Sequence, residues 1–544
     1  MIKDFVCDLK KEFKGYNSSS LIKDMLSGLT VTAVALPLAL AFGVSSGVTG
    51  ASGMITAIFA GIVIALLGGA SYQISGPTGA MTAVLVPIAM KYGIKGIFIA
   101  GFLSGVILLI AGIFKIGHIV HYIPVPVITG FTSGIAVIIA LGQIDNLFGT
   151  VSKGDNAVNK LISYSYLGFK PNFTALAIGL LVIAIMIAWP KKLNMVFPSS
   201  LAAIIAAVLV SILFKLNVAV VGDIPRKLIL DERLRFSYLS LSSIKDFIMP
   251  AISIAALGLI ETLLCGSSAG RMKNEKINAD RELVAQGIGN MLIPFFGGVP
   301  ATAAIARTSV AIKSGSKTRL TSVIHSIGLI ISMFVLSPVM SKIPLSALAG
   351  VLIVTAWRMN EWEAIKNIFS KRFKGAIWKF ILTMTATIVF DLTIAIIVGI
   401  IFSLILFMVR ISDVDIVVSD IYPEKLSSRN LDLSMLEKTK VIYFTGPLFF
   451  GTAEKLSAIL SELDGIEYVI LSMRGTPMID ISGSIVLHEC LTDLTNKGIK
   501  IAFSAVNPKV SEMLKRTDTS NIISDENIFW STDEAISAMI EKCA

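Results

Sequence analysis

Between residues 24 and 410 the chain is a succession of apolar segments separated by short polar loops, and this pattern leaves few fold classes open. Hydrophobic residues make up 54% of the chain and charged residues only 15%, and the mean hydropathy is +0.79. A water-soluble protein of 544 residues could not cover its surface with so few charges. The sequence therefore predicts an α-helical polytopic membrane protein with about fourteen transmembrane segments.

These segments fall into two sets of seven. The third segment begins Gly-Pro-Thr-Gly-Ala at Gly76, and the tenth begins Val-Pro-Ala-Thr-Ala at Val299. An odd number of spans in a repeat turns the second copy upside down, so we expect two inverted repeats of seven. The expected segments are 24–46, 51–69, 77–91, 94–114, 125–149, 172–190, 196–215, 247–270, 282–297, 300–313, 319–338, 344–358, 375–391 and 393–410.

The third and tenth segments are too short to span a membrane. About 14 residues of helix reach about 21 Å, whereas the hydrocarbon core is about 30 Å thick. We therefore expect half-helices that start near mid-membrane, with Pro77 and Pro300 in their first turns and their N-termini facing each other. Helix N-termini carry free N–H groups and partial positive charge, so two of them make an anion site. The alternative is a pair of ordinary Pro/Gly kinks.

Two lone charges lie inside this apolar region. Glu261 is the only charged residue in 247–270, and Arg307 is the only one in 283–312. Ionisable groups at such depth usually face a cavity or a partner. Arg307 shares a helix face with Ala303 and Ala304 and is expected to attract the anion. Glu261 is hypothesised to take up a proton with the anion; the alternative is a structural pair with Arg307.

The chain divides into three expected parts. Residues 1–23 are a basic cytoplasmic segment, 24–410 form the transmembrane anion transporter domain, and 411–544 read as a cytoplasmic α/β domain. The first apolar run has no cleavage site and is a retained span, and basic loops place both termini in the cytoplasm. In the tail we expect strands at 441–444, 468–471 and 499–504 and helices at 484–496 and 508–516.

No metal site, cofactor or nucleic-acid partner is expected. The four cysteines are scattered without CxxC spacing, and the chain has only four histidines. The net charge of +10 fits basic cytoplasmic loops and needs no nucleic-acid surface to explain it.

The chain resembles the SulP anion-transporter family, whose animal relatives include pendrin and prestin, over nearly its whole length. The tail resembles a STAS domain. The stretches that carry the resemblance are 35–43, 75–80, 260–262, Asn290, 300–302 and 307–308 in the membrane region, and 447–451 and 478–483 in the tail.

The resemblance implies core and gate domains, a homodimer, a cell (inner) membrane location and an elevator-like movement of the core. It departs from many members at Leu38, Ala304 and Ala306, where hydroxyl or amide side chains are common, so backbone N–H groups would bind more of the anion. Arg307 fills a position that sodium-driven bicarbonate carriers leave uncharged, which argues against sodium coupling. The expected substrate-binding residues are Phe42, Pro77, Thr78, Gly79, Ala303, Ala304 and Arg307.

Ser482 matches the serine that is phosphorylated in anti-anti-sigma proteins, which the STAS domain resembles. It is a possible regulatory phosphosite, and a cytoplasmic protein partner at this domain is possible. The alternative is that Ser482 is a structural helix N-cap.

These observations predict a secondary active transporter of small anions, not an enzyme, with proton symport and sulfate as the default substrate. Bicarbonate, chloride and C4-dicarboxylates stay open, as does sodium coupling. An anion channel, a nucleobase permease and a sensor that uses its tail are the alternatives from other classes.

Overall fold

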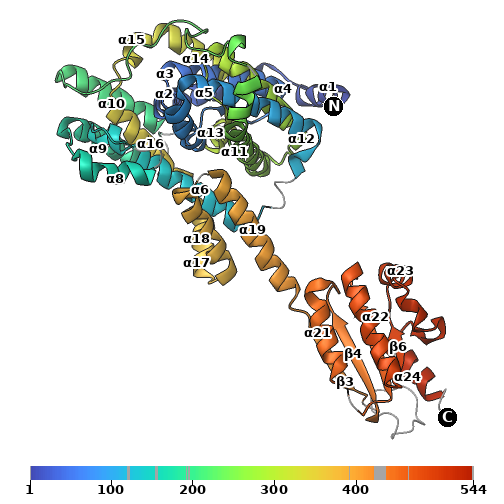
Figure 1. Ribbon diagram of the computed structural model, residues 1–544. Helices are drawn as coiled ribbons and strands as arrows, with labels where there is room; N and C mark the ends of the chain where they lie inside the picture. Colours follow the sequence, from blue (N-terminus) through green and yellow to red (C-terminus); the bar gives the residue numbers. More distant parts are fainter. Residues whose placement is uncertain are drawn as a thin grey trace. The chain divides into compact units, whose positions relative to one another are not determined.

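The computed structural model describes residues 2–118, 123–153, 157–190, 193, 197–239, 241–390, 392–421, 437–463 and 465–541. The chain divides into two compact units, Met1–Ile401 and Phe402–Ala544. The first unit is helical and the second is built on a five-stranded sheet (Figure 1).

The helices of the first unit follow the apolar segments of the sequence, which confirms the predicted helical transmembrane fold. Among the described residues, five helical stretches are long and apolar enough to cross a membrane, and shorter apolar helices lie between and after them. The helices are α1 (Ile2–Glu12), α2 (Ser18–Ser45), α3 (Gly50–Phe59), α4 (Ala65–Leu67), α5 (Gly79–Ile113), α6 (Val125–Gly142), α7 (Ile144–Phe148), α8 (Ala157–Leu167), α9 (Phe173–Ala188), α10 (Ser199–Leu213), α11 (Leu241–Lys273), α12 (Ala279–Leu292), α13 (Ile305–Lys313), α14 (Leu320–Val335), α15 (Ser337–Met340), α16 (Leu345–Met359), α17 (Trp362–Ser370) and α18 (Lys374–Val389). Helix α19 (Leu392–Ile411) begins in the first unit and ends in the second.

The third predicted segment, 77–91, ends close to an observed interruption of helix α5. Helix α5 is interrupted at Gly93, whose backbone has φ 70° and ψ −174°. A side chain would strain this conformation, and glycine adopts it freely. The helix is therefore two helices in succession, and the first of them is a half-helix.

The N-terminal segment is more ordered than its polar composition suggests. It forms α1, which the sequence analysis did not predict, and α2 begins at Ser18 rather than near residue 24. Glu12 forms a buried ion pair of 2.8 Å with Arg319 at the start of α14, and Asp8 pairs with Arg281 in α12 at 2.7 Å. These contacts fasten α1 to the first unit.

Helices of the first unit pack closely where glycines face neighbouring backbone. Helix α5 packs against α11 and α12, α2 against α3 and α14, α6 against α18, and α9 against α16. A Cβ on Gly287 of α12 would lie 2.5 Å from the Leu109 backbone nitrogen, and one on Gly105 would lie 2.6 Å from that of Met291. Small residues let helix backbones touch in this way in membrane proteins.

The second unit is an α/β domain, as predicted. Its sheet has the order β3-β4-β5-β6-β7, with the β3–β4 pair antiparallel and the other pairs parallel. The predicted strands and helices are confirmed, and the structure adds β3, β7, α21 and α24. The elements are β3 (Asp415–Asp420), β4 (Thr439–Thr445), α21 (Phe450–Ser461), β5 (Tyr468–Gly475), α22 (Ile481–Asn496), β6 (Lys500–Ser504), α23 (Pro508–Arg516), β7 (Ile528–Phe529) and α24 (Thr532–Glu541).

Candidate functional site

The two interrupted segments meet in a short antiparallel ladder. Strand β1 (Ser75–Gly76) precedes α5, and strand β2 (Thr302–Ala303) precedes α13. Ser75 pairs with Ala303, and Gly76 pairs with Thr302. Each helix starts within three residues of its strand, so the ladder brings the N-termini of α5 and α13 close together. The predicted adjacency of the two breaks is confirmed.

The predicted place of the two prolines is wrong. Helix α5 begins at Gly79 with Thr78 as its N-cap, so Pro77 lies outside the helix. Helix α13 begins at Ile305, five residues after Pro300. Both prolines flank the ladder, where the missing N–H and the fixed φ of proline suit extended backbone at the end of a strand.

The N-terminus of α5 is joined to Glu261 through Thr78. The Thr78 hydroxyl accepts a hydrogen bond from the Met81 N–H (3.3 Å) and donates one to Glu261 Oε2 (3.0 Å). The ring of Phe42 lies beside the same helix end, because a Cβ on Gly79 would come within 3.1 Å of Phe42 Cε1. A cavity of ≈ 750 Å³ in the first unit is lined by both Phe42 and Gly79. This end of α5 is therefore open to a small solute.

The N-terminus of α13 has no side-chain cap. Its N-cap residue is Ala304, whose own N–H donates to the carbonyl of Ile74 at 3.0 Å. The Ala303 N–H donates to the Thr262 hydroxyl at 3.4 Å, and Ala303 is buried. Ala304 is partly exposed, and the following residue, Ile305, is exposed. The accessible donors at this helix end therefore begin after Ala304.

Arg307 places a fixed positive charge behind the ladder. Its side chain is 1% exposed, and its Nη2 donates to the carbonyl of Pro77 at 2.8 Å. Its Nη1 has no hydrogen-bond partner among the described residues. A Cβ on Gly76 would lie only 2.5 Å from this atom, so the guanidinium rests against the bend between β1 and α5.

Glu261 of α11 lies beside the N-terminus of α5 but does not form a salt bridge with Arg307. Both residues are described, and the ion pairs of 4.0 Å or less do not include them. The opposite charges attract each other through space. The pairing of these two charges therefore does not take the form of a direct salt bridge, and the described hydrogen-bond partner of Glu261 is Thr78.

Several polar side chains that the sequence analysis did not assign to the site hold its extended backbone. Asn290 donates to the Ala301 carbonyl (2.9 Å) and accepts from the Ala301 N–H (2.7 Å). The Thr56 hydroxyl accepts from the Val299 N–H (2.7 Å), and the Thr308 hydroxyl accepts from the Ile74 N–H (3.0 Å). These side chains could have been predicted from the sequence, because each is an isolated polar residue in an apolar segment and buried polar groups need hydrogen-bond partners.

In the second unit, the alternative that Ser482 is a helix N-cap is wrong. Asp480 caps α22, and its carboxylate accepts from the Gly483 N–H at 2.7 Å. Ser482 is exposed in the first turn of that helix. The hydroxyl is thus accessible, and its phosphorylation stays a prediction.

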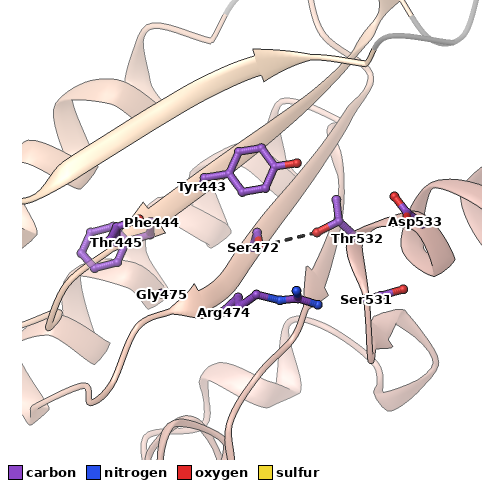
Figure 2. Close-up of a pocket in the computed structure, with 9 residues that line it drawn as sticks. All are labelled: Tyr443, Phe444, Thr445, Ser472, Arg474, Gly475, Ser531, Thr532 and Asp533. Carbon is purple, nitrogen blue, oxygen red and sulfur yellow. Dashed lines mark hydrogen bonds between the residues drawn. The ribbon is translucent and has the colours of Figure 1, made fainter. Parts of the chain in front are cut away.

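The second unit also has a polar pocket of ≈ 430 Å³ (Figure 2). Arg474 of β5 and Asp533 of α24 both line it, together with hydroxyl groups, and the Thr532 hydroxyl donates to that of Ser472 at 3.5 Å. Opposite charges share this pocket, so its lining does not favour one class of ion. Among the residues described in either unit, His, Cys, Asp and Glu side chains form no cluster of three or more that could hold a metal ion.

Interrupted helices that meet inside an apolar helical unit, followed by a separate α/β domain, define a class of protein: a multi-pass membrane transporter with a C-terminal domain. The model of the sulfate permease family matches residues 21–385, and that of the STAS domain matches residues 430–535. The chain belongs to the sulfate permease family, and its second unit contains a STAS domain.

The similar proteins cover almost the whole chain. A Bacillus subtilis protein provisionally named sulfate transporter YvdB is 34% identical over 96% of this chain and 98% of its own length. The bicarbonate transporter BicA of a Picosynechococcus species is 27% identical over 94% of both chains. The structure of the BicA transmembrane domain covers 72% of this chain and 98% of that domain, with a TM-score of 0.63 and 27% identity.

The murine anion transporter Slc26a9 in its inward-facing state has the same fold, with a TM-score of 0.83. It covers 96% of this chain and 92% of its own chain at 17% identity, so the likeness concerns the fold alone.

Proposed function

We propose that the first unit binds a small inorganic anion, with sulfate as the preferred substrate, between the N-termini of α5 and α13. The observation that carries this proposal is the ladder of β1 and β2, which brings two helix ends together beside a buried guanidinium. The site residues are Phe42, Pro77, Thr78, Gly79, Ala303, Ala304 and Arg307, with backbone N–H groups as the main donors.

Charge balance gives Glu261 its part in the cycle. Two helix ends supply about one positive charge together, and Arg307 supplies another. A divalent anion with an ionised Glu261 leaves the site negative, whereas a protonated Glu261 leaves it balanced. Burying a site that has a net charge costs free energy. Sulfate is therefore carried together with a proton on Glu261.

Bicarbonate is the second candidate, because the BicA relative is 27% identical over 94% of this chain. The same sum of charges predicts that sulfate and bicarbonate differ in proton coupling. A monovalent anion is neutralised with Glu261 ionised, so bicarbonate transport through this site needs no proton.

The proposed cycle is an elevator movement of a core domain, which carries the site, against a gate domain in a homodimer. The protein acts in the cell membrane with both termini in the cytoplasm.

The STAS domain binds a cytoplasmic protein, and phosphorylation of Ser482 regulates this contact; the exposed hydroxyl supports that role.

Uptake into proteoliposomes tests the transport proposal. We expect radiolabelled sulfate to enter faster when an inward proton gradient is imposed, and a sodium gradient to have no effect. Bicarbonate and succinate are tested in the same vesicles. Sulfate uptake that ignores the proton gradient would refute proton coupling, and an ion current far faster than the measured uptake would indicate a channel.

Glu261→Gln gives the sharper test. The glutamine is neutral at every pH and can still accept from Thr78, so sulfate binding should persist while the pH dependence of binding disappears. Sulfate binding by this variant that still rises steeply as the pH falls would contradict a coupling role for Glu261.

A further inference from the structure

Helix α17 is an amphipathic connection between two apolar helices of the first unit. It connects the C-terminus of α16 to the N-terminus of α18. Its apolar residues Trp362, Ile365, Ile368 and Phe369 recur at three- and four-residue spacing, which is the spacing of one helix face. Ile368 is buried, whereas Trp362 and Phe369 are exposed. The rest of the chain therefore covers only part of the apolar face of α17.

Exposed tryptophans gather at this connection. Trp357 at the end of α16, Trp362 in α17 and Trp378 in the first turns of α18 are 65%, 44% and 63% exposed. Trp357 and Trp362 lie with their rings 4.4 Å apart, and the Trp362 Nε1–H donates to the Trp357 carbonyl at 3.0 Å. Tryptophan is enriched at membrane–water interfaces because its ring is apolar and its N–H is polar. Three exposed tryptophan rings at one connection are typical of a segment at a membrane surface.

The same connection is rich in exposed positive charge. Lys366, Lys371, Arg372 and Lys374 are all exposed. Within the described residues, none of the four makes a salt bridge of 4.0 Å or less. The acidic residues of this stretch, Glu361 and Glu363, lie at the opposite end of α17. The basic end is therefore available to an external anion.

We infer that α17 and the turn that follows it bind the headgroups of anionic phospholipids. The exposed tryptophans enter the boundary between headgroups and acyl chains, and the basic residues of 366–374 contact the phosphates. Helix α17 packs against α6 and α18, so the bound lipids hold that pair of helices at a fixed depth in the membrane. This inference is independent of which anion the protein carries.

Quenching of tryptophan fluorescence by brominated lipids tests the inference in the full-length protein. Trp189→Phe and Trp530→Phe leave only the three tryptophans of this connection. Nanodiscs contain phosphatidylglycerol and phosphatidylcholine in equal amounts, with one or the other brominated. We expect brominated phosphatidylglycerol to quench more strongly, and the difference to vanish in about 1 M salt, where the screening length is about 3 Å.

A charge variant and a matched control complete the test. Combining Lys371→Gln, Arg372→Gln and Lys374→Gln should lower the preference for phosphatidylglycerol by about fivefold for each charge removed. The same substitution at three exposed lysines of the STAS domain should leave it unchanged; these are Lys497, Lys509 and Lys515.

Three outcomes would overturn the inference. One is equal quenching by both lipids in the parent protein, a result that does not depend on any variant folding. Another is an undiminished preference in the monodisperse triple variant. The third is quenching by neither lipid, which would show that the tryptophans do not reach the lipids, whether water or a second copy of the chain surrounds them.

Discussion

Gly76→Ala tests whether the guanidinium of Arg307 acts on the anion. A Cβ at position 76 would lie 2.5 Å from Arg307 Nη1 and 3.3 Å from the Cα of Ala57. The first distance is shorter than any van der Waals contact, and Arg307 is 1% exposed. The guanidinium therefore has to move away from the ladder and stretch its 2.8 Å hydrogen bond to the Pro77 carbonyl. The variant shifts the positive charge without removing it, and because Gly76 has a φ of 159° the added side chain also strains the backbone of β1.

The expected loss depends on the charge of the anion. With an effective dielectric constant of about 20, moving a unit charge from about 5 Å to about 7 Å from a divalent anion costs about 2 kcal/mol, or about 25-fold in affinity. For a monovalent anion the cost is about half, or about fivefold. The affinity for sulfate should therefore fall more than the affinity for bicarbonate.

Titration calorimetry of sulfate and bicarbonate with the purified protein measures both effects. Gly142→Ala is the matched control, because Gly142 lines the cavity and a Cβ there would meet no atom within 4 Å. Unchanged sulfate affinity in a correctly folded Gly76→Ala protein would refute the role of Arg307. Equal losses for the two anions would show that the effect is steric and not electrostatic.

Two further predictions concern parts of the chain away from the ladder. Glu12→Gln removes the partner of Arg319 in a pair whose side chains are 9% and 3% exposed, and denaturant titration should show a loss of about 3 kcal/mol in the free energy of unfolding. Asp231→Asn, in an exposed pair, should change it by less than about 1 kcal/mol, and equal effects would contradict a buried role for α1. Burial raises the pKa of the Cys490 thiol above its ordinary value of 9.0, so less reactive thiolate is present at neutral pH. In two variants that keep either Cys7 or Cys490 as the sole cysteine, maleimide should label the exposed Cys7 at least about tenfold faster than Cys490 at pH 7. Labelling of Cys490 should keep rising with pH beyond 9.0, and equal rates at pH 7 would show that Cys490 is open to solvent.

The site could be predicted in outline because its signals are local. The break at Gly93, the short tenth segment and the lone charges Glu261 and Arg307 are all visible in short windows of sequence. A charge inside an apolar segment needs a partner or a cavity whatever the fold, so the sequence identifies such residues without showing their contacts. The same reasoning misplaced Pro77, because the two-residue ladder that keeps it outside the helix is formed with a strand more than two hundred residues away.

The helix cap in the STAS domain shows the same limit on a smaller scale. Asp480 and Ser482 both stand near the start of α22, and either residue type suits an N-cap. The helix begins one residue after Asp480, and this start depends on how the preceding loop packs on the sheet. Only the tertiary structure decided which side chain became the cap.

By itself, the sequence determined that this chain crosses a membrane many times, breaks two of its spans and carries an α/β tail, because hydropathy and helix length are properties of neighbouring residues. The tertiary structure decided which groups meet at the breaks: the hydroxyl of Thr78 on Glu261, the guanidinium of Arg307 against Gly76, and the amide of Asn290 on Ala301. The first two of these contacts join residues far apart in the chain, and even the short-range one depends on how α12 packs. Such contacts are fixed by how whole helices pack, and no local pattern encodes that packing.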